Sequence, residues 1–206
     1  MHWGIEQAAG AAPIAAPGKY TARLRVGGQS YTRPIEVLKD PAILSSDEDL
    51  VASTRQQLRI RDDMNATADM ANTIERLRKQ IEDQLKANKG KAAAERSLSS
   101  LDETLLAVEL RLLSMTDLHS DDKWYVEKYQ IYMNLVWLSG VVGNGAGDVA
   151  GGAEYRPTDA SVAVLDTIDK DLAQVKARFK TIVETAVPAF NRTAASLGLA
   201  PLAEVK

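Results

Sequence analysis

Histidine is the side chain that most often serves acid–base catalysis and metal binding near neutral pH. The chain has two, His2 and His119. His119 lies in the acidic run 117–122 (DLHSDD), where an imidazole and several carboxylates could together bind a divalent cation. The run lacks the H-x-x-E-H and D-x-D-x-D-G spacings that place such ligands around one ion. We therefore expect turn and helix-cap residues here and keep a metal-binding helical bundle only as an alternative function.

The remaining residue patterns that could do chemistry are incomplete. Adjacent carboxylates, such as Asp62-Asp63 and Asp121-Asp122, point in different directions on a helix, so we expect them on solvated surface. The Glu-x-x-His motif of di-iron bundles and the G-x-S-x-G serine motif are absent. The Gly-rich run 140–152 lacks the Lys and Ser/Thr of a phosphate-binding loop, and the chain has no cysteine. We assign no catalytic, cofactor-binding or metal-binding residue and expect no enzyme activity from this chain on its own.

Composition and hydropathy argue against some kinds of partner and segment. The net charge is −3 and aromatic residues make up 5% of the chain, which argues against a nucleic-acid-binding protein. No apolar run reaches the roughly 18 residues that indicate a membrane-spanning helix, although docking on a membrane complex stays open. Residues 1–10 show neither a basic n-region nor an apolar h-region, so we expect no signal peptide in this stretch.

The sequence nevertheless predicts regular secondary structure, beginning with a β-hairpin. Residues 19–26 (KYTARLRV) alternate, and residues 29–38 form a second extended run. Gly27-Gly28 between them suits a two-residue turn, because glycine accepts positive φ. Pro34 cannot donate to a ladder, so the second strand should be an edge or be interrupted there. One face is expected to carry four residues of the first strand: Tyr20, Ala22, Leu24 and Val26.

Four longer stretches predict helices, at 47–88, 91–115, 122–142 and from the cap Thr158 to Pro188, which should end or kink the last one. The charged residues of the first helix are expected on a solvated face. Heptad-like apolar stripes mark the second and fourth helices. They consist of Ala94, Leu98, Leu101, Leu105, Val108, Leu112 and Met115, and of Val162, Leu165, Ile168, Leu172, Val175, Phe179 and Ile182.

These elements predict a mainly α fold in which a β-hairpin precedes a four-helix antiparallel bundle. The expected domains are an irregular lead-in plus hairpin (1–41) and the helical bundle (42–206). A lone hairpin is marginal in water, so something should pack on it or complete its sheet. We expect partner contacts at aromatic residues of the lead-in, the hairpin and the third helix, namely Trp3, Tyr20, Tyr31, Trp124 and Tyr125.

Several short motifs occur in a fixed order along the chain. Trp3 is followed by P-G-x-Y-x-x-x-L-x-V-x-G at 17–28 and by Lys39-Asp40-Pro41. The helical part contains Ser120-Asp121-Asp122, Arg156-Pro157-Thr158, Val187-Pro188-Ala189-Phe190-Asn191 and Gly198-Leu199-Ala200-Pro201-Leu202. Together these motifs resemble the C-terminal region of bacterial BNR/Asp-box, sortilin (VPS10)-type "glycosyl hydrolase" family proteins. That resemblance covers nearly the whole chain.

The resemblance implies that the hairpin is part of an Ig-like segment that follows a β-propeller, and that the protein is periplasmic or secreted. Asp-box repeats are absent here, so any propeller residues that act on a substrate would lie outside this chain. The leading hypothesis is a non-catalytic interaction or scaffolding module, either the tail or an accessory subunit of a larger extracytoplasmic assembly. The alternatives are a part of a propeller-type glycoside or peptide hydrolase, and the metal-binding bundle. The expected partner is a protein, or the parent polypeptide, that completes the hairpin.

Overall fold

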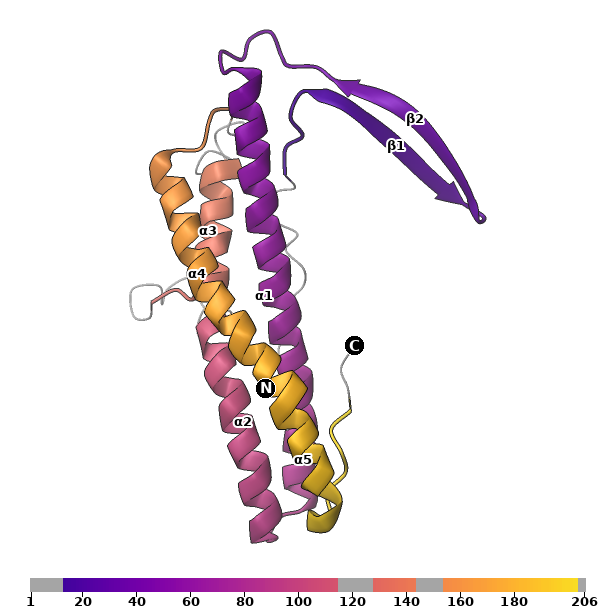
Figure 1. Cartoon of the computed structure of the whole chain (residues 1–206), viewed down its shortest axis with the longest axis vertical. Helices are drawn as coiled ribbons and strands as arrows, with labels where there is room; N and C mark the ends of the chain where they lie inside the picture. Colours follow the sequence, from indigo (N-terminus) through magenta and orange to yellow (C-terminus); the bar gives the residue numbers. More distant parts are fainter. Residues whose placement is uncertain (1–12, 115–127, 144–153, 204–206) are drawn as a thin grey trace. The chain divides into compact units, whose positions relative to one another are not determined.

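The computed structural model describes residues 13–114, 128–143 and 154–203, of which 68% are helical (Figure 1). A two-stranded antiparallel hairpin precedes four longer helices, which confirms the predicted fold class. In chain order the elements are β1 (Gly18–Val26), β2 (Gln29–Val37), α1 (Asp47–Ala87), α2 (Ala92–Leu112), α3 (Ile131–Gly143), α4 (Asp159–Thr181), a π-helical turn (Ile182–Ala186), α5 (Val187–Ala194) and a 3₁₀ turn (Ala195–Leu197).

The chain divides into two compact units, and α1, α3 and α4 each contribute to both. The hairpin unit contains, of the described residues, 13–62, 137–143 and 154–165. The helical unit contains residues 63–114, 128–136 and 166–203. Each unit is described separately below.

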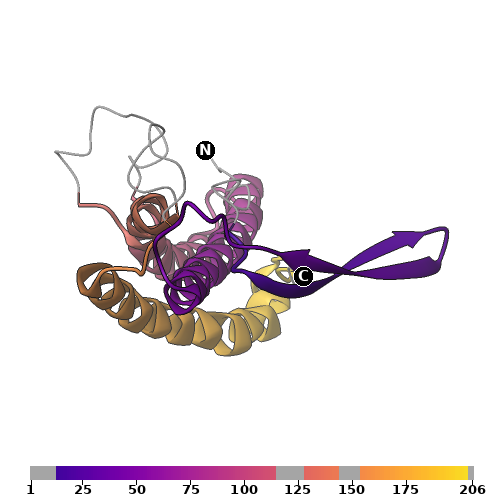
Figure 2. The same cartoon turned by 90° about the horizontal axis from the view of Figure 1, so that it is seen from above.

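In the hairpin unit, the turn forms as the two glycines predict. Gly27 and Gly28 have φ values of 56° and 81°, which L-residues with a Cβ rarely adopt. Positive φ at both positions is typical of the type I′ turn, whose twist matches that of the flanking strands. The strands pair in register from Val26↔Gln29 back to Gly18↔Val37, and the resulting ribbon is visibly twisted (Figure 2).

Side-chain caps start two of the helices where the sequence places them. The backbone N–H of Asp49 donates to Ser46 Oγ at 3.2 Å, and the backbone N–H of Ser46 donates to an Asp49 carboxylate oxygen at 3.3 Å. This reciprocal pair is a capping box, and the Ser46 hydroxyl holds the pKa of Asp49 below its usual value. The backbone N–H of Ser161 donates to Thr158 Oγ1 at 3.1 Å, which confirms Thr158 as the cap of α4.

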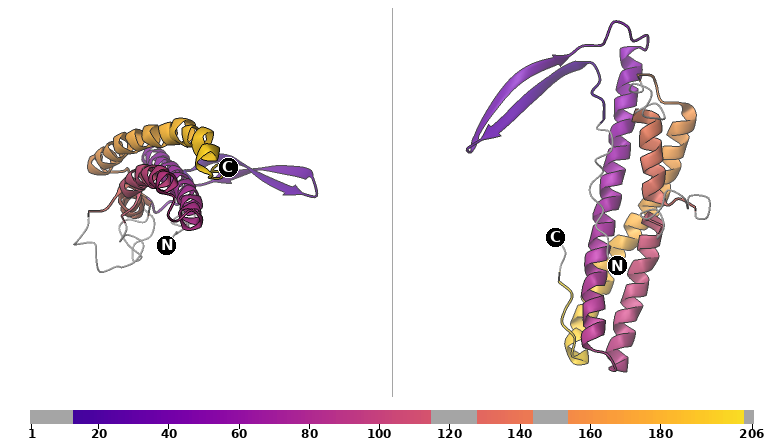
Figure 3. Two further views of the ribbon diagram at one scale, coloured as in Figure 1. Left: turned by 90° about the horizontal axis from the view of Figure 1, so that it is seen from below. Right: turned by 180° about the vertical axis from the view of Figure 1, so that it is seen from behind.

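In the helical unit, most described residues of the predicted stripes lie in the core. Leu98, Leu105 and Leu172 are fully buried or nearly so, together with Ile74 and Ile81 of α1. The chain turns from α1 into α2 at Gly90, whose φ is 88°, and the two helices lie side by side (Figure 3). Burial of each large aliphatic side chain contributes roughly 1.5–3 kcal/mol, so this core stabilises the antiparallel packing.

One predicted helix limit is wrong, and the end-or-kink prediction for Pro188 is resolved against an ending. Residues 128–130 are not helical, so the expected helix over 122–142 begins later, at Ile131, while 122–127 lie outside the described residues. Pro188 does not end the last helix: the π-helical turn before it leads directly into α5. A π turn widens the hydrogen-bonding pattern, so the missing N–H and the bulk of the proline ring are accommodated. The helical run ends at Gly198, whose φ is 68°.

Candidate protein-interaction site

The hairpin has one apolar face and one polar face. Residues directly opposite each other in an antiparallel pair project to the same side of the sheet. The register therefore gathers on one side, here called the apolar face, the residues Tyr20, Ala22, Leu24, Val26, Tyr31, Ile35 and Val37, with Arg33 as its only charged residue. The opposite polar face carries Lys19, Thr21, Arg23, Arg25, Ser30, Thr32, Pro34 and Glu36.

The apolar face is open to solvent. Every residue from 19 to 36 is exposed, and the exposed fractions are 61% for Leu24, 58% for Val26, 55% for Tyr31 and 49% for Ile35. Monomeric proteins rarely leave a contiguous set of large apolar side chains uncovered, and such sets mark interaction sites. The four cations and one acid of the two strands give the hairpin a positive charge, whereas the chain as a whole carries −3.

The first leg of the hairpin is bound to α1 through its backbone. The Ile14 N–H donates to Gln57 Oε1 at 2.9 Å, and Thr54 Oγ1 donates to the Ile14 carbonyl at 2.7 Å. Gln57 is buried, and its amide group also donates to Ser53 Oγ at 3.0 Å. Ala16 is buried too and accepts a 2.7 Å hydrogen bond from the Tyr20 hydroxyl. The entry to β1 is therefore anchored on α1.

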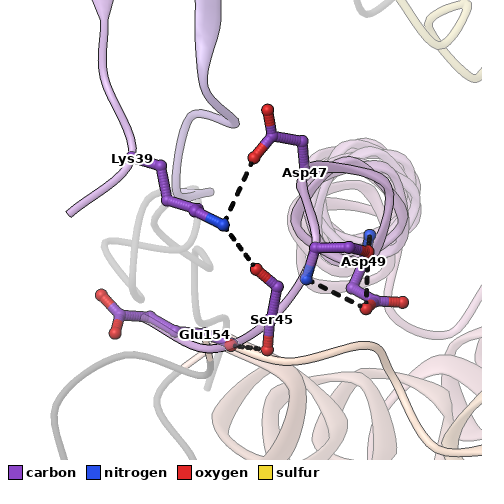
Figure 4. Close-up of polar contacts among 6 residues, drawn as sticks. Lys39, Ser45, Asp47, Asp49 and Glu154 are labelled. Carbon is purple, nitrogen blue, oxygen red and sulfur yellow. Dashed lines mark hydrogen bonds and ion pairs between the residues drawn. The ribbon is translucent and has the colours of Figure 1, made fainter. Parts of the chain in front are cut away.

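The second leg is held by the loop that leads into α1 (Figure 4). Lys39 Nζ donates to the Ser45 carbonyl at 2.9 Å and lies 3.7 Å from Asp47 Oδ1. The Ser45 hydroxyl donates to the Glu154 carbonyl at 2.6 Å, which ties the loop to the segment before α4. These contacts anchor the exit from β2, so both legs of the hairpin are held while its strands stay exposed.

A cavity of about 230 Å³ lies between the two legs. Apolar side chains of both legs and of α1 line it, including Ile14, Val37, Ile43 and Leu50, and Thr54 and Gln57 supply polar atoms. Leu38 at its edge is 77% exposed. The cavity thus continues the uncovered apolar surface of the hairpin down to its root.

The helical unit contains a separate cluster of charged side chains around Arg78. The Arg78 guanidinium donates to Asp102 Oδ1 at 3.0 Å and to Glu109 Oε2 at 2.5 Å, and lies 3.9 Å from a Glu75 oxygen. The Arg78 and Glu109 side chains are only 18% and 7% exposed. The expectation that the charges of α1 lie on a solvated face is therefore wrong for Arg78.

One cation cannot neutralise three partly buried carboxylates, so the cluster retains a proton. Burial raises the pKa of Glu109, and the adjacent Glu75 carboxyl acts in the same direction, whereas Arg78 opposes both; the resulting pKa is about 8. The Glu75–Glu109 pair thus holds a proton more tightly than an exposed carboxyl does. The cluster joins α1 to α2 through the bonds from Arg78 to Asp102 and Glu109.

A second carboxylate pair joins α1 to α4. Asp63 faces Asp169, and burial together with this neighbour raises the pKa of Asp63 to about 6, opposed by Lys176 at 3.3 Å. The sequence pair Asp62-Asp63 was expected on solvated surface, but the Asp63 side chain is only 18% exposed. Sequence reasoning missed this pair because its members are far apart along the chain.

Of the five predicted contact residues, Tyr20 and Tyr31 lie together on the apolar face, opposite Ile35 and Leu24 respectively. Trp3, Trp124 and Tyr125 lie outside the described residues, as do both histidines and the acidic run at 117–122. Ile35 of β2 was not among the five predicted contact residues, but it adds a further large apolar side chain to the apolar face. The alternation of β2 was the signal that could have found it.

Within the described part of the chain, no group of three or more His, Cys, Asp or Glu side chains is arranged to hold a metal ion. No helix in the same ranges is long and apolar enough to cross a membrane. A scan against protein-family models and searches of curated proteins and of solved structures find no match to this chain.

Proposed function

We propose that this chain is a non-catalytic interaction module that presents its hairpin to a β-rich partner. In this proposal it is the tail or an accessory subunit of a larger extracytoplasmic assembly, and its periplasmic or secreted location rests on the family resemblance. The observation that carries the proposal is the apolar face: large side chains on a two-stranded sheet that is exposed from residue 19 to 36 and anchored at both legs.

The low stability of an isolated two-stranded hairpin supports a partner that covers it. An isolated two-stranded hairpin is marginally stable in water, and three or more strands or a packed apolar face are needed for independent stability. Covering the side chains of Leu24, Tyr31 and Ile35 would each contribute on the order of 1 kcal/mol or more, because about half of each is exposed. A β-rich partner supplies both the additional strand and the apolar cover.

The anchored root supports a docking role for the hairpin. Both legs are fixed by hydrogen bonds to α1 or to its leading loop. A pre-organised element loses little conformational freedom when it binds, so more of the contact energy appears as affinity. The helices then serve as the support from which the hairpin is presented.

Site-specific photo-cross-linking tests the proposal in cells of the native source. A benzophenone side chain is placed on the apolar face at Leu24, and a matched control replaces Leu110, an exposed leucine of α2. We expect the Leu24 position to give one dominant product, mapped by mass spectrometry to a β-rich segment, and the double variant Tyr20→Ser/Ile35→Ser to abolish it. A cross-link within a longer form of the same polypeptide identifies a tail, and one to a separate protein identifies an accessory subunit. Equal products from Leu24 and Leu110, or none from Leu24, would overturn the proposal.

A further inference from the structure

The two outer edges of the hairpin differ in their backbone hydrogen-bonding groups. In an antiparallel pair, directly opposite residues alternate between hydrogen-bonded and non-hydrogen-bonded pairs. Val26 and Gln29 flank a two-residue turn and therefore form a hydrogen-bonded pair. Counting back along the register, the non-hydrogen-bonded pairs are Lys19↔Glu36, Thr21↔Pro34, Arg23↔Thr32 and Arg25↔Ser30.

Residues of non-hydrogen-bonded pairs direct their N–H and C=O groups away from the partner strand. The outer edge of β1 therefore offers an uninterrupted series of such groups at Lys19, Thr21, Arg23 and Arg25. The outer edge of β2 is interrupted in its middle, because Pro34 has no N–H to offer. Proline at this position costs no bond within the hairpin, since its nitrogen faces outward.

Charge distinguishes the two edges as well. The outward-directed residues of β1 include three cations, Lys19, Arg23 and Arg25, all exposed and without an ion pair to any residue in the described ranges. The corresponding residues of β2 include one acid, Glu36, and no cation. A strand added beside β1 places its own polar face next to these cations, so acidic residues at alternate positions complement them.

We infer that the outer edge of β1 is the edge that receives a partner strand, and that this strand alternates acidic and apolar residues. The inference rests on the proposed docking function and adds which edge is used and what pairs with it. The strand extends the sheet, and apolar residues of the same partner cover the apolar face at Tyr20, Leu24 and Ile35.

A lipid surface fits the hairpin less well. Lys19, Arg23 and Arg25 project from the face opposite the apolar side chains. A hairpin lying on a membrane with its apolar face inserted would direct these cations away from the anionic headgroups. An added strand uses the cations, the free backbone groups and the apolar face together.

The test uses the full chain and a synthetic peptide matched in length to β1 that alternates Glu and Val, with a Lys/Val peptide and anionic phospholipid vesicles as the other probes. Binding is followed by amide chemical shifts and hydrogen exchange. We expect the Glu/Val peptide to shift and protect the amides of Lys19, Thr21, Arg23 and Arg25 while the outward amides of β2 stay unchanged. Protection at the β2 amides instead, or binding to vesicles but not to the peptide, would overturn the inference.

Two matched variants separate the edges. Thr21→Pro removes an outward N–H from β1, and Thr32→Pro removes one from β2, and neither removes a bond within the hairpin. We expect at least a tenfold loss of Glu/Val peptide binding from Thr21→Pro and less than a twofold change from Thr32→Pro, with the contacts between Tyr20 and Ile35 retained as evidence of folding. If Thr21→Pro disturbs the hairpin, the double variant Arg23→Glu/Arg25→Glu tests the edge assignment instead. We expect this variant to bind the Lys/Val peptide in preference to the Glu/Val peptide, because the charge of the β1 edge is reversed.

The outcomes also separate this inference from the docking function. If Thr21→Pro binds normally but Tyr20→Ser/Ile35→Ser does not, the assignment of the edge fails and docking through the apolar face stands. If neither variant changes binding of the peptide or cross-linking from Leu24, the proposed function fails as well.

Discussion

Thr21 of β1 lies directly opposite Pro34 of β2, in a pair whose backbone groups face outward. The proline therefore leaves the ladder between the strands intact and removes one N–H from the outer edge of β2. Proline is one of the devices by which proteins protect an edge strand against unwanted pairing. The hairpin thus has one edge that proline interrupts and one edge with a continuous series of outward backbone groups.

Pro34→Val should make the protein self-associate. Valine restores an N–H in the middle of the β2 edge and has a high preference for strands, so two hairpins can pair edge to edge. We expect concentration-dependent dimers or larger species in sedimentation velocity. Thr32→Val is the matched control, because Thr32 shares the polar face and the outward direction of Pro34 but already has its N–H. Equal association of both variants would show that apolar character, not the free edge, is responsible.

Gln57→Met should loosen the first leg of the hairpin. The substitution keeps the length of the side chain but removes the acceptor for the Ile14 N–H. One hydrogen bond contributes about 1 kcal/mol net, so we expect exchange of the Ile14 amide to become roughly five- to tenfold faster. Gln56→Met is the control, since Gln56 is equally buried but bonds to Ser161 Oγ instead. Unchanged exchange at Ile14 in Gln57→Met would remove Gln57 from the anchor.

Arg78→Met should destabilise the helical unit strongly. The methionine fills much of the same space but leaves Glu109, Asp102 and Glu75 without their shared cation. Removing one partner of a buried ion pair costs about 3–5 kcal/mol, although protonation of the carboxyls reduces this loss at low pH. Urea denaturation measures the change, with Arg76→Met on the exposed side of α1 as the control. A loss no larger than that of the control would show that the cluster is stabilised by other contacts.

Glu109→Gln should flatten the pH dependence of stability. The folded pKa of Glu109, about 8, lies above its unfolded value of 4.5, so the folded state binds the proton more tightly. The contribution of this group is therefore fully present below pH 4.5 and is lost as the pH rises through 8. Glutamine cannot ionise, so the variant should lose less stability than the parent between pH 5 and 9. Parallel stability profiles over that range would contradict the raised pKa.

Leu105→Ala should test the core of the helical unit. Leu105 is completely buried, and removing its side chain leaves a cavity, which typically costs 2–5 kcal/mol. Leu110→Ala, on the exposed side of the same helix, should cost under about 1 kcal/mol. Thermal unfolding monitored by circular dichroism distinguishes them, and similar melting temperatures would mean that the stripe is not the packing seam.

Local patterns predicted most of the fold because the forces behind them are local. Alternation and Gly27-Gly28 predicted the hairpin, and the stripe through Leu98 and Leu105 predicted α2. The sequence did not predict the π turn before Pro188, because such a turn depends on hydrogen bonds that leave no sequence period. The buried role of Arg78 was also missed, since its partners Asp102 and Glu109 come from another helix.

The candidate site was partly predictable for the same reason. Tyr20 and Tyr31 could be placed on strands from sequence alone, and the register then brought them to one face. The anchors at Gln57 and Ser45 could not be predicted, because they join residues that are distant in the chain and carry no motif.

The separation in sequence between Ile14 and Gln57 has a consequence for synthesis of the chain. The hairpin pairs residues at most 19 positions apart, from Val26↔Gln29 to Gly18↔Val37, so it can form within about 1–10 μs of emerging from the ribosome. Its anchor on α1 needs Gln57, which lies 20 positions after Val37, the last paired residue of the hairpin, and at about 5–20 residues per second the ribosome needs roughly 1–4 s to make that stretch. During this interval the nascent chain carries the apolar residues of the hairpin without their anchor, and a chaperone or a co-translational partner would have its first access to them.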